Sequence, residues 1–131
     1  MRVMLDTNVL VSAIIFPNDR MDSMIYKATL NHQLVLSSYI IGELLDVTGR
    51  KFPGKTQDVN MFLHRLPYEL VYTPKEPDYE FFSIRDMNDY PVLYSAIIEN
   101  VDLFVTGDDD FKGVDVERPE IVSPSEFLER Y

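Results

Sequence analysis

The sequence predicts an α/β protein with a three-layer α/β/α fold, in which helices cover both faces of a central, mostly parallel sheet of four or five strands. Apolar runs with the length of buried strands alternate with stretches whose apolar residues recur at helical spacing. The 131 residues have the length of one domain, 46% of them are apolar, and no repeat or low-complexity tract interrupts them. We therefore expect a single domain over residues 1–131.

Short apolar runs define the expected sheet. The predicted strands cover residues 3–5, 33–36, 69–72, 103–105 and 121–122. Apolar residues at helical spacing define the helices between and after these strands. The helices are expected to run to about residue 15, across residues 24–30, up to Gly49, over residues 56–66, from Asp89 onward and from Ser125 onward, with a short helical turn at 78–84.

Small polar side chains mark where most of these helices begin. The candidate caps are Thr7 and Asn8 for the first helix, Asp19 or Asp22 for the second, Ser37 and Ser38 for the third, and Ser125 for the last. Residues 16–19 form a turn between the first two helices. After the third helix, residues 50–55 are expected to form an exposed loop in which Arg50, Lys51 and Lys55 make the only cluster of positive charge.

The chain is strongly acidic, with 12 Lys and Arg residues against 22 Asp and Glu residues and a formal charge of −10. From Asp78 to Asp110 there are nine acids and one base, Arg85. Such a chain repels phosphate backbones on average, which argues against a general nucleic-acid binder but is compatible with a metal-dependent enzyme or a basic partner. Surplus acid that only keeps the protein soluble explains the charge equally well.

Composition excludes several classes of site. No cysteine is present, so disulfides, thiolate nucleophiles and Cys-based zinc sites are excluded. No stretch reaches the roughly 20 apolar residues that span a bilayer. The first apolar run contains Asp6 and Asn8, so it reads as a strand and a helix, not as a signal peptide. We expect a cytoplasmic protein with no membrane partner.

Five acids lie where an apolar strand ends or in the helical turn that follows it. They are Asp6, Glu43, Asp89, Asp108 and Asp110. If the strands are parallel neighbours, all five carboxylates come to one edge of the sheet, where ligands bind in such folds. Converging carboxylates repel each other unless cations neutralise them. The pattern therefore predicts a divalent metal site, and such a site beside a groove usually acts on phosphate esters.

Each acid taken alone has a simpler explanation. Asp6 can be the N-cap of the following helix, and Glu43 can face solvent. Asp86 competes with Asp89 for one role, and we interpret Asp86 as a cap or a surface charge. Asp109 is expected to be solvated. The metal-site prediction rests on the combination, because independent caps would not all fall at one end of one sheet.

Polar neighbours support this interpretation. Asn8 can orient the Asp6 carboxylate or contribute an amide oxygen, and Thr106 can donate a hydrogen bond to a carboxylate or to a metal-bound water. Neither histidine is placed to act as a base, so we expect His32 and His64 to be surface or helix residues.

Three segments carry a family resemblance: LDTNVLVSAII, YIIGELLDV and NDYPVLYSAIIENVDLFVTGDDDF. They resemble PIN-domain nucleases, and within these the small single-domain toxin components of prokaryotic toxin–antitoxin pairs (VapC-like). The resemblance implies that Asp6, Glu43, Asp89 and Asp108 hold one or two Mg²⁺ or Mn²⁺ ions, with Asp110 as a further acid. It also implies an RNA substrate, a cognate antitoxin and a homodimer.

The predicted reaction is metal-assisted hydrolysis of phosphodiester bonds in single-stranded or structured RNA. Arg50, Lys51 and Lys55 are the candidate contacts to the RNA backbone, although a loop that is only solvated explains them equally well. One alternative is an inactive PIN fold used as a scaffold, although such a protein would be expected to lose metal ligands. Another is an Asp-based phosphotransfer protein, which needs a Lys near the phosphoryl group, and no Lys follows a strand here. Apolar residues on and before the second helix predict a dimer interface formed by Phe16, Met21, Met24, Ile25 and Tyr26, although a wide core-facing stripe explains them equally well.

Overall fold

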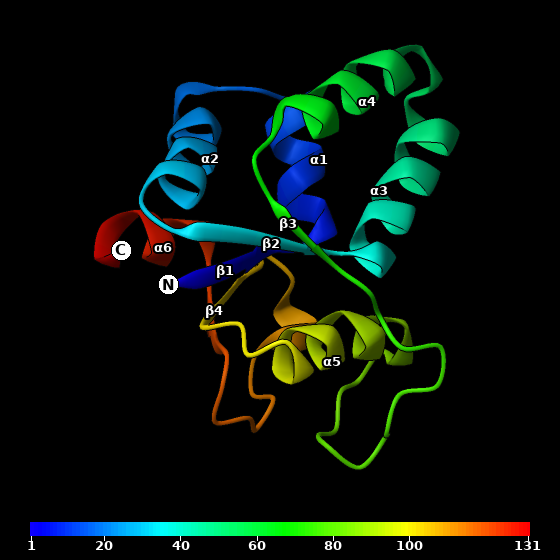
Figure 1. The fold of residues 1–131 in the computed structure, drawn as a ribbon, viewed down its shortest axis with the longest axis vertical. Helices are drawn as coiled ribbons and strands as arrows, with labels where there is room; N and C mark the ends of the chain where they lie inside the picture. The colour runs from blue at the N-terminus through cyan, green and yellow to red at the C-terminus, as the bar shows by residue number, and fades with distance from the viewer.

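A five-stranded sheet in which every neighbouring pair is parallel forms the middle layer of the computed structural model, which describes residues 1–131 (Figure 1). The strands are β1 (Arg2–Leu5), β2 (Gln33–Ser37), β3 (Glu69–Val71), β4 (Leu103–Val105) and β5 (Glu120–Val122), in the spatial order β3-β2-β1-β4-β5. Because all five strands run the same way, their carboxyl ends meet at one edge of the sheet. The predicted α/β class and parallel sheet are confirmed.

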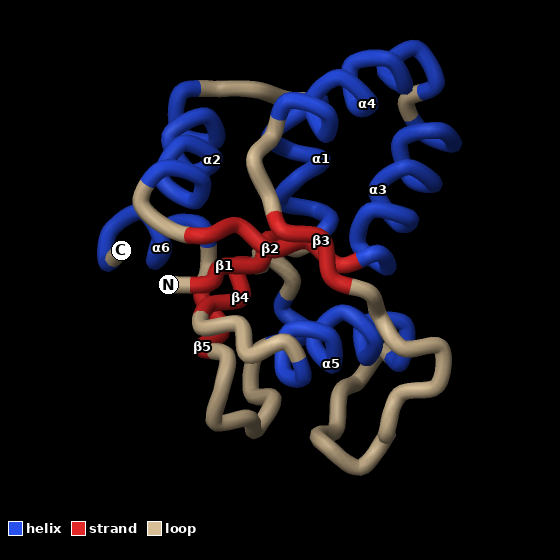
Figure 2. The backbone as a smooth tube through the Cα atoms, viewed as in Figure 1, coloured by secondary structure: helices blue, strands red, loops and turns tan.

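Six helices surround the sheet. They are α1 (Thr7–Ile15), α2 (Asp19–Leu30), α3 (Ser38–Lys51), α4 (Thr56–Arg65), α5 (Tyr90–Ile98) and α6 (Pro124–Arg130). In Figure 2, α1, α2 and α4 lie on one side of the sheet and α5 lies on the other, which gives the three predicted layers. Helix α6 packs against α2. None of the helices combines the length and apolar character that crossing a membrane requires.

The central strands are apolar along their length because both of their faces are covered. Val3, Met4 and Leu5 of β1 have no solvent exposure, and neither have Phe104 and Val105 of β4. Parallel strands covered on both faces show such continuous apolar runs instead of alternation. Burial of this surface is the main favourable term in folding, and the two strands that precede Asp6 and Asp108 are buried in this way.

Three predicted helix caps were wrong by a few residues. Asp6, and neither Thr7 nor Asn8, caps α1, because its carboxylate accepts a hydrogen bond from Thr7 N. Asn18, and neither Asp19 nor Asp22, caps α2, because its extended backbone lets Oδ1 accept a hydrogen bond from Met21 N. Ser123, and not Ser125, caps α6: its hydroxyl and the Glu126 carboxylate form a reciprocal capping box. The two acids in the first turn of α2 still favour the helix through its dipole.

The third helix does not end at Gly49, as predicted, but continues to Lys51. A glycine costs a helix only about 1 kcal/mol, and the chain breaks instead at Phe52, whose backbone is pushed from the helical region by Pro53. A 3₁₀ turn over Pro53–Lys55 then leads into α4. The predicted basic loop over residues 50–55 is therefore almost entirely helical.

The segment before α5 contains no helical turn at 78–84, contrary to prediction, and forms an irregular loop. Tyr90 holds this loop in place. Its hydroxyl donates to the Asp78 carbonyl at 2.5 Å and accepts from Phe81 N at 3.2 Å, and its ring stacks on Phe82 at 4.1 Å between centroids. These tertiary contacts outweigh the weak local preference for a helix. A 3₁₀ turn over Met87–Asp89 follows and leads into α5.

The apolar residues near α2 do not form one surface. Met21 and Met24 are 7% and 0% exposed and belong to the core, whereas Phe16 and Tyr26 are 59% and 67% exposed. An amphipathic helix places residues three and four apart on its inner face, which accounts for the burial of both methionines. Of the five residues predicted to form the dimer interface, Phe16, Tyr26 and the half-buried Ile25 remain available for it.

Candidate metal centre

Asp6 lies at the junction of β1 and α1 and is 6% exposed. Its backbone N–H still bonds to the Val105 carbonyl at 2.9 Å, as an extension of the sheet. Its carboxylate accepts one hydrogen bond from Thr7 N and one from the Thr106 hydroxyl, both at 2.8 Å. Asp6 is thus the N-cap of α1, as the simpler explanation held, and the same carboxylate is tied to the residue after β4.

Thr7 connects Asp6 to Glu43. The Thr7 side chain is buried, and its hydroxyl donates to Glu43 Oε1 at 2.5 Å across the interface between α1 and α3. From the sequence, Thr7 was predicted only to cap the first helix, and Asn8 was predicted to support Asp6. Asn8 is exposed and makes no hydrogen bond to Asp6. The position of the Thr7 hydroxyl directly after Asp6 was the feature of the sequence that could have indicated this contact.

The turn after β4 positions Asp108 and Asp110. Thr106 Oγ1 accepts from Asp108 N at 3.0 Å, and Asp108 Oδ1 accepts from Asp110 N at 2.9 Å. The turn over Asp109–Phe111 is anchored by Phe111, which is 1% exposed and packs on Phe104. Asp109 is exposed and pairs with a lysine, in line with the expectation that it is solvated.

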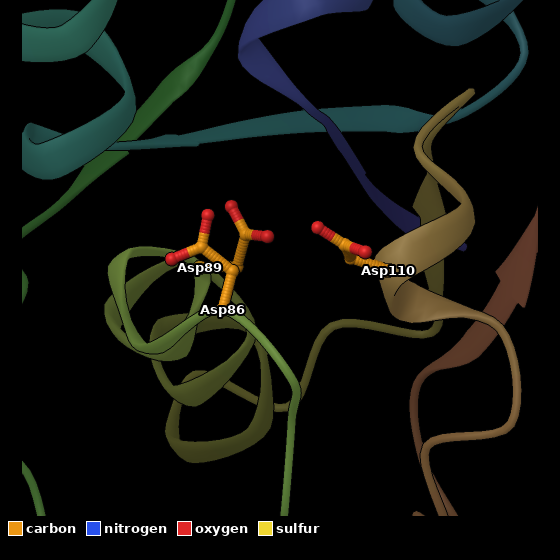
Figure 3. A group of neighbouring side chains, drawn as sticks. All are labelled: Asp86, Asp89 and Asp110. Atoms are coloured by element: carbon orange, nitrogen blue, oxygen red, sulfur yellow. The ribbon is translucent and has the colours of Figure 1, made fainter.

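Asp86, Asp89 and Asp110 form the tightest group of carboxylates. One oxygen from each lies within 4.8 Å of the other two. Asp86 and Asp89 come from the turn that leads into α5, and Asp110 reaches toward them from the turn after β4 (Figure 3). Asp86 caps its turn by accepting from Asn88 N at 2.9 Å, as predicted, but it also belongs to this group, which the sequence analysis did not expect. Asp6, Glu43 and Asp108 are not members of it.

Burial and mutual repulsion perturb two of these acids. Burial raises the pKa of Asp6 to about 6, and the charges of Glu43 and Asp108 add to the rise, while hydrogen bonds from Thr106 and Thr7 oppose it. Burial also raises the pKa of Asp89 to about 7, with further contributions from Asp108, Asp86, Asp6 and Asp110. The acids from four separate segments therefore interact electrostatically and form one acidic centre.

The donor set fits a hard divalent cation. Asp89 Oδ2 is buried and has no hydrogen-bond partner, so it is free to act as a ligand. All the surrounding groups offer oxygen, which suits Mg²⁺ or Mn²⁺ better than zinc. A cation here would offset the burial and the mutual repulsion that raise both pKa values.

Tyr39 is a further residue of the centre that the sequence analysis missed. It lies one helical turn before Glu43 on α3, and its hydroxyl donates to the Asn88 carbonyl at 3.0 Å. Burial, followed by the charges of Glu43, Asp89 and Asp86, raises its pKa. The i, i+4 spacing from Glu43 was the available signal.

The predicted basic contacts lie apart from these acids. Arg50 and Lys51 are in the last turn of α3, about 10 Å beyond Glu43 along the helix axis. Arg50 pairs with Asp46, and Lys55 pairs with Asp58. Neither histidine adjoins the centre: His32 packs against Phe127, and His64 is exposed on α4.

Comparison with known proteins accounts for this arrangement. Residues 2–110 match the family model described as the PIN domain. The chain belongs to the PIN-domain family. No curated protein matches the sequence. Among solved structures, VapBC2 from Rickettsia felis, crystallised with a DNA fragment from its promoter, shares 24% identity over 93% of this chain and 97% of that chain, with a TM-score of 0.71.

A second structure extends this comparison of folds. VapC20 from Mycobacterium tuberculosis, described as a toxin that cleaves the sarcin–ricin loop, shares 11% identity with the present chain. The match covers 89% of this chain and 99% of that chain, with a TM-score of 0.58. Both structures have the PIN fold seen here.

The raised pKa of Asp89 predicts that this residue destabilises the metal-free protein at neutral pH. The folded state holds the proton more tightly than the unfolded state, so stability falls as pH rises from about 4 to about 7. In chelator, Asp89→Asn should raise Tm at pH 8 by about 3–5 °C, or about 1 kcal/mol after allowance for partial exposure, and have little effect at pH 4. Thermal unfolding followed by circular dichroism tests this.

The exposed Asp46→Asn serves as the control and should leave Tm nearly unchanged at both pH values. A lower Tm for Asp89→Asn at pH 8 would show that Asp89 is not repelled by its neighbours.

Proposed function

We propose that this PIN-domain protein is an Mg²⁺- or Mn²⁺-dependent endoribonuclease and the toxin of a toxin–antitoxin pair. The observation that carries the proposal is the buried, unpartnered Asp89 Oδ2, in a centre where burial and then neighbouring acids raise the pKa of both Asp89 and Asp6. Such an arrangement costs stability unless a cation is bound. The family assignment supports a nuclease, and the fold shared with VapC20 supports RNA as the substrate.

Asp6, Glu43, Asp89 and Asp108 would hold the cation, with Asp110 as a further ligand. A bound Mg²⁺ or Mn²⁺ supplies Lewis-acid activation of the attacking water and neutralises charge on the phosphate. The chain's contribution is to hold the ligands still: the Thr106 hydroxyl orients Asp6, and the Thr7 hydroxyl orients Glu43. Both threonines are buried, so these carboxylates are positioned before any substrate arrives.

The two alternatives are less well supported. A scaffold protein has no need to keep five acids at one centre at a cost in stability. An Asp-based phosphotransfer protein needs a Lys beside the phosphoryl group, whereas the basic side chain paired with these acids is Arg85, through Asp110. The geometry therefore favours metal-dependent hydrolysis.

Cleavage of RNA should require both the cation and these acids. Purified protein should cut a labelled RNA in Mn²⁺ and lose all activity in excess chelator. Asp89→Asn should lower the rate by at least about 10–100-fold, the loss typical of residues that merely orient a metal ligand. Asp46→Asn, an exposed acid on the same helix as Glu43, should cleave like the wild type. Cleavage that survives the chelator would refute the proposal.

Two partners follow from the family resemblance. We infer a cognate antitoxin that inserts Arg or Lys among the acids in place of the cation, because an acidic centre attracts basic groups. The reading frame beside the gene is the first place to look for it. We also infer a homodimer that uses the exposed Phe16 and Tyr26, since large aromatic side chains exposed on a monomer surface favour association.

The dimer has a specific test. Light scattering at high micromolar concentration should report a dimer for the wild type and a monomer for Tyr26→Glu, because a buried, unpaired charge opposes association. Tyr26 replaces Met24 as the site to change, since Met24 is in the core and its substitution would unfold the chain. Tyr72→Glu, equally exposed but beyond β3, should remain dimeric. A monomeric wild type would rule out the interface.

A further inference from the structure

A small hollow lined by two basic side chains, Arg85 and Lys112, adjoins the acidic centre. Its volume is about 200 Å³, and its lining includes Ser83, Arg85, Asp109, Asp110, Lys112 and Gly113. This volume is below the range of about 300–1,000 Å³ that holds a whole small-molecule ligand. The volume is suited to a single charged group of a longer ligand, such as one phosphate of a nucleic-acid strand. Asp110 belongs both to this hollow and to the group formed with Asp86 and Asp89.

The two basic side chains of the hollow lie in a strongly acidic part of the chain. Nine acids lie between Asp78 and Asp110, and Arg85 is the one base among them. Lys112 follows two residues later. A phosphate backbone that approached the acidic centre would be repelled by the carboxylates and attracted by these two side chains. Arginine in particular binds phosphate oxygens through two parallel hydrogen bonds.

Arg85 and Lys112 can exchange their ion-pair partners at little cost in stability. Arg85 pairs with Asp110 and Lys112 pairs with Asp109, yet the two basic side chains are 82% and 79% exposed. Exposed ion pairs contribute little stability. Asp110 is different, because its side chain is only 18% exposed and it is one of the three closest carboxylates. A divalent cation held there would compete with Arg85 for the same oxygens.

We propose that Arg85 and Lys112 form a phosphate subsite for the RNA backbone, and that Arg85 exchanges Asp110 for phosphate when the acidic centre holds a divalent cation. The inference rests on the proposed nuclease function and names the contact through which the strand would be held. It also makes RNA binding depend on the cation. Without the cation, Asp110 retains the guanidinium and the carboxylates repel the strand.

Binding can be measured apart from cleavage. We would follow the fluorescence anisotropy of a labelled, 2′-O-methylated single-stranded oligoribonucleotide, shown by gel to stay intact, in Mn²⁺ and in chelator. The wild type should bind more tightly in Mn²⁺. In Mn²⁺, Arg85→Gln should weaken binding about 10-fold and reduce the slope of log K against log salt by about 0.7, the value for one lost phosphate contact on a single strand. Lys112→Gln should reduce the slope similarly.

Arg65→Gln, an exposed charge loss on α4, is the matched control and should bind like the wild type. Unchanged affinity and salt slope in Arg85→Gln and Lys112→Gln would overturn the subsite, as would a wild type that does not bind the oligonucleotide at all. If Arg50→Gln alone weakened binding, the contact would lie at the end of α3. Arg85-dependent binding without RNA cleavage by the wild type would refute the nuclease function and leave the subsite standing.

Discussion

The parallel pairing of β1 with β4 is the constraint on which the rest of the site depends. Its register sets Leu5 opposite Val105, so the next residues of the two strands, Asp6 and Thr106, come together. The apolar side chains of both strands are buried, and a slip of one residue would exchange the faces of the sheet against which they pack. The apolar core thereby fixes a polar contact that contributes little to folding itself.

A cost in electrostatic free energy accompanies this arrangement. The fold uses apolar burial to hold acids from four segments together, and the raised pKa values of Asp6 and Asp89 are the measure of that cost. Natural proteins keep such unfavourable groups where function needs them. Hydroxyl groups help to position the segments that bear these acids. Thr7, Thr106 and Tyr39 each make one hydrogen bond that links two segments of the centre.

The sequence allowed the fold class and the parallel sheet to be predicted, because both follow from periodicity. The contacts of individual side chains could not be predicted. The hydroxyl of Thr7 reaches Glu43, 36 residues away, and Asp86 lies beside Asp110 through the packing of two irregular turns. The caps at Asn18 and Ser123 were missed for a different reason: several suitable side chains stood next to each other, and local geometry chose among them.

The central claim is that a divalent cation belongs among these carboxylates, and the protons released on binding test it most directly. Calorimetric titration with Mn²⁺ in buffers of different ionisation enthalpy counts them. With pKa values of about 7 for Asp89 and about 6 for Asp6, binding at pH 6.5 should release about one proton, and binding at pH 8.5 should release almost none. Mn²⁺ binding with the same proton count at both pH values, or no binding at all, would contradict the account.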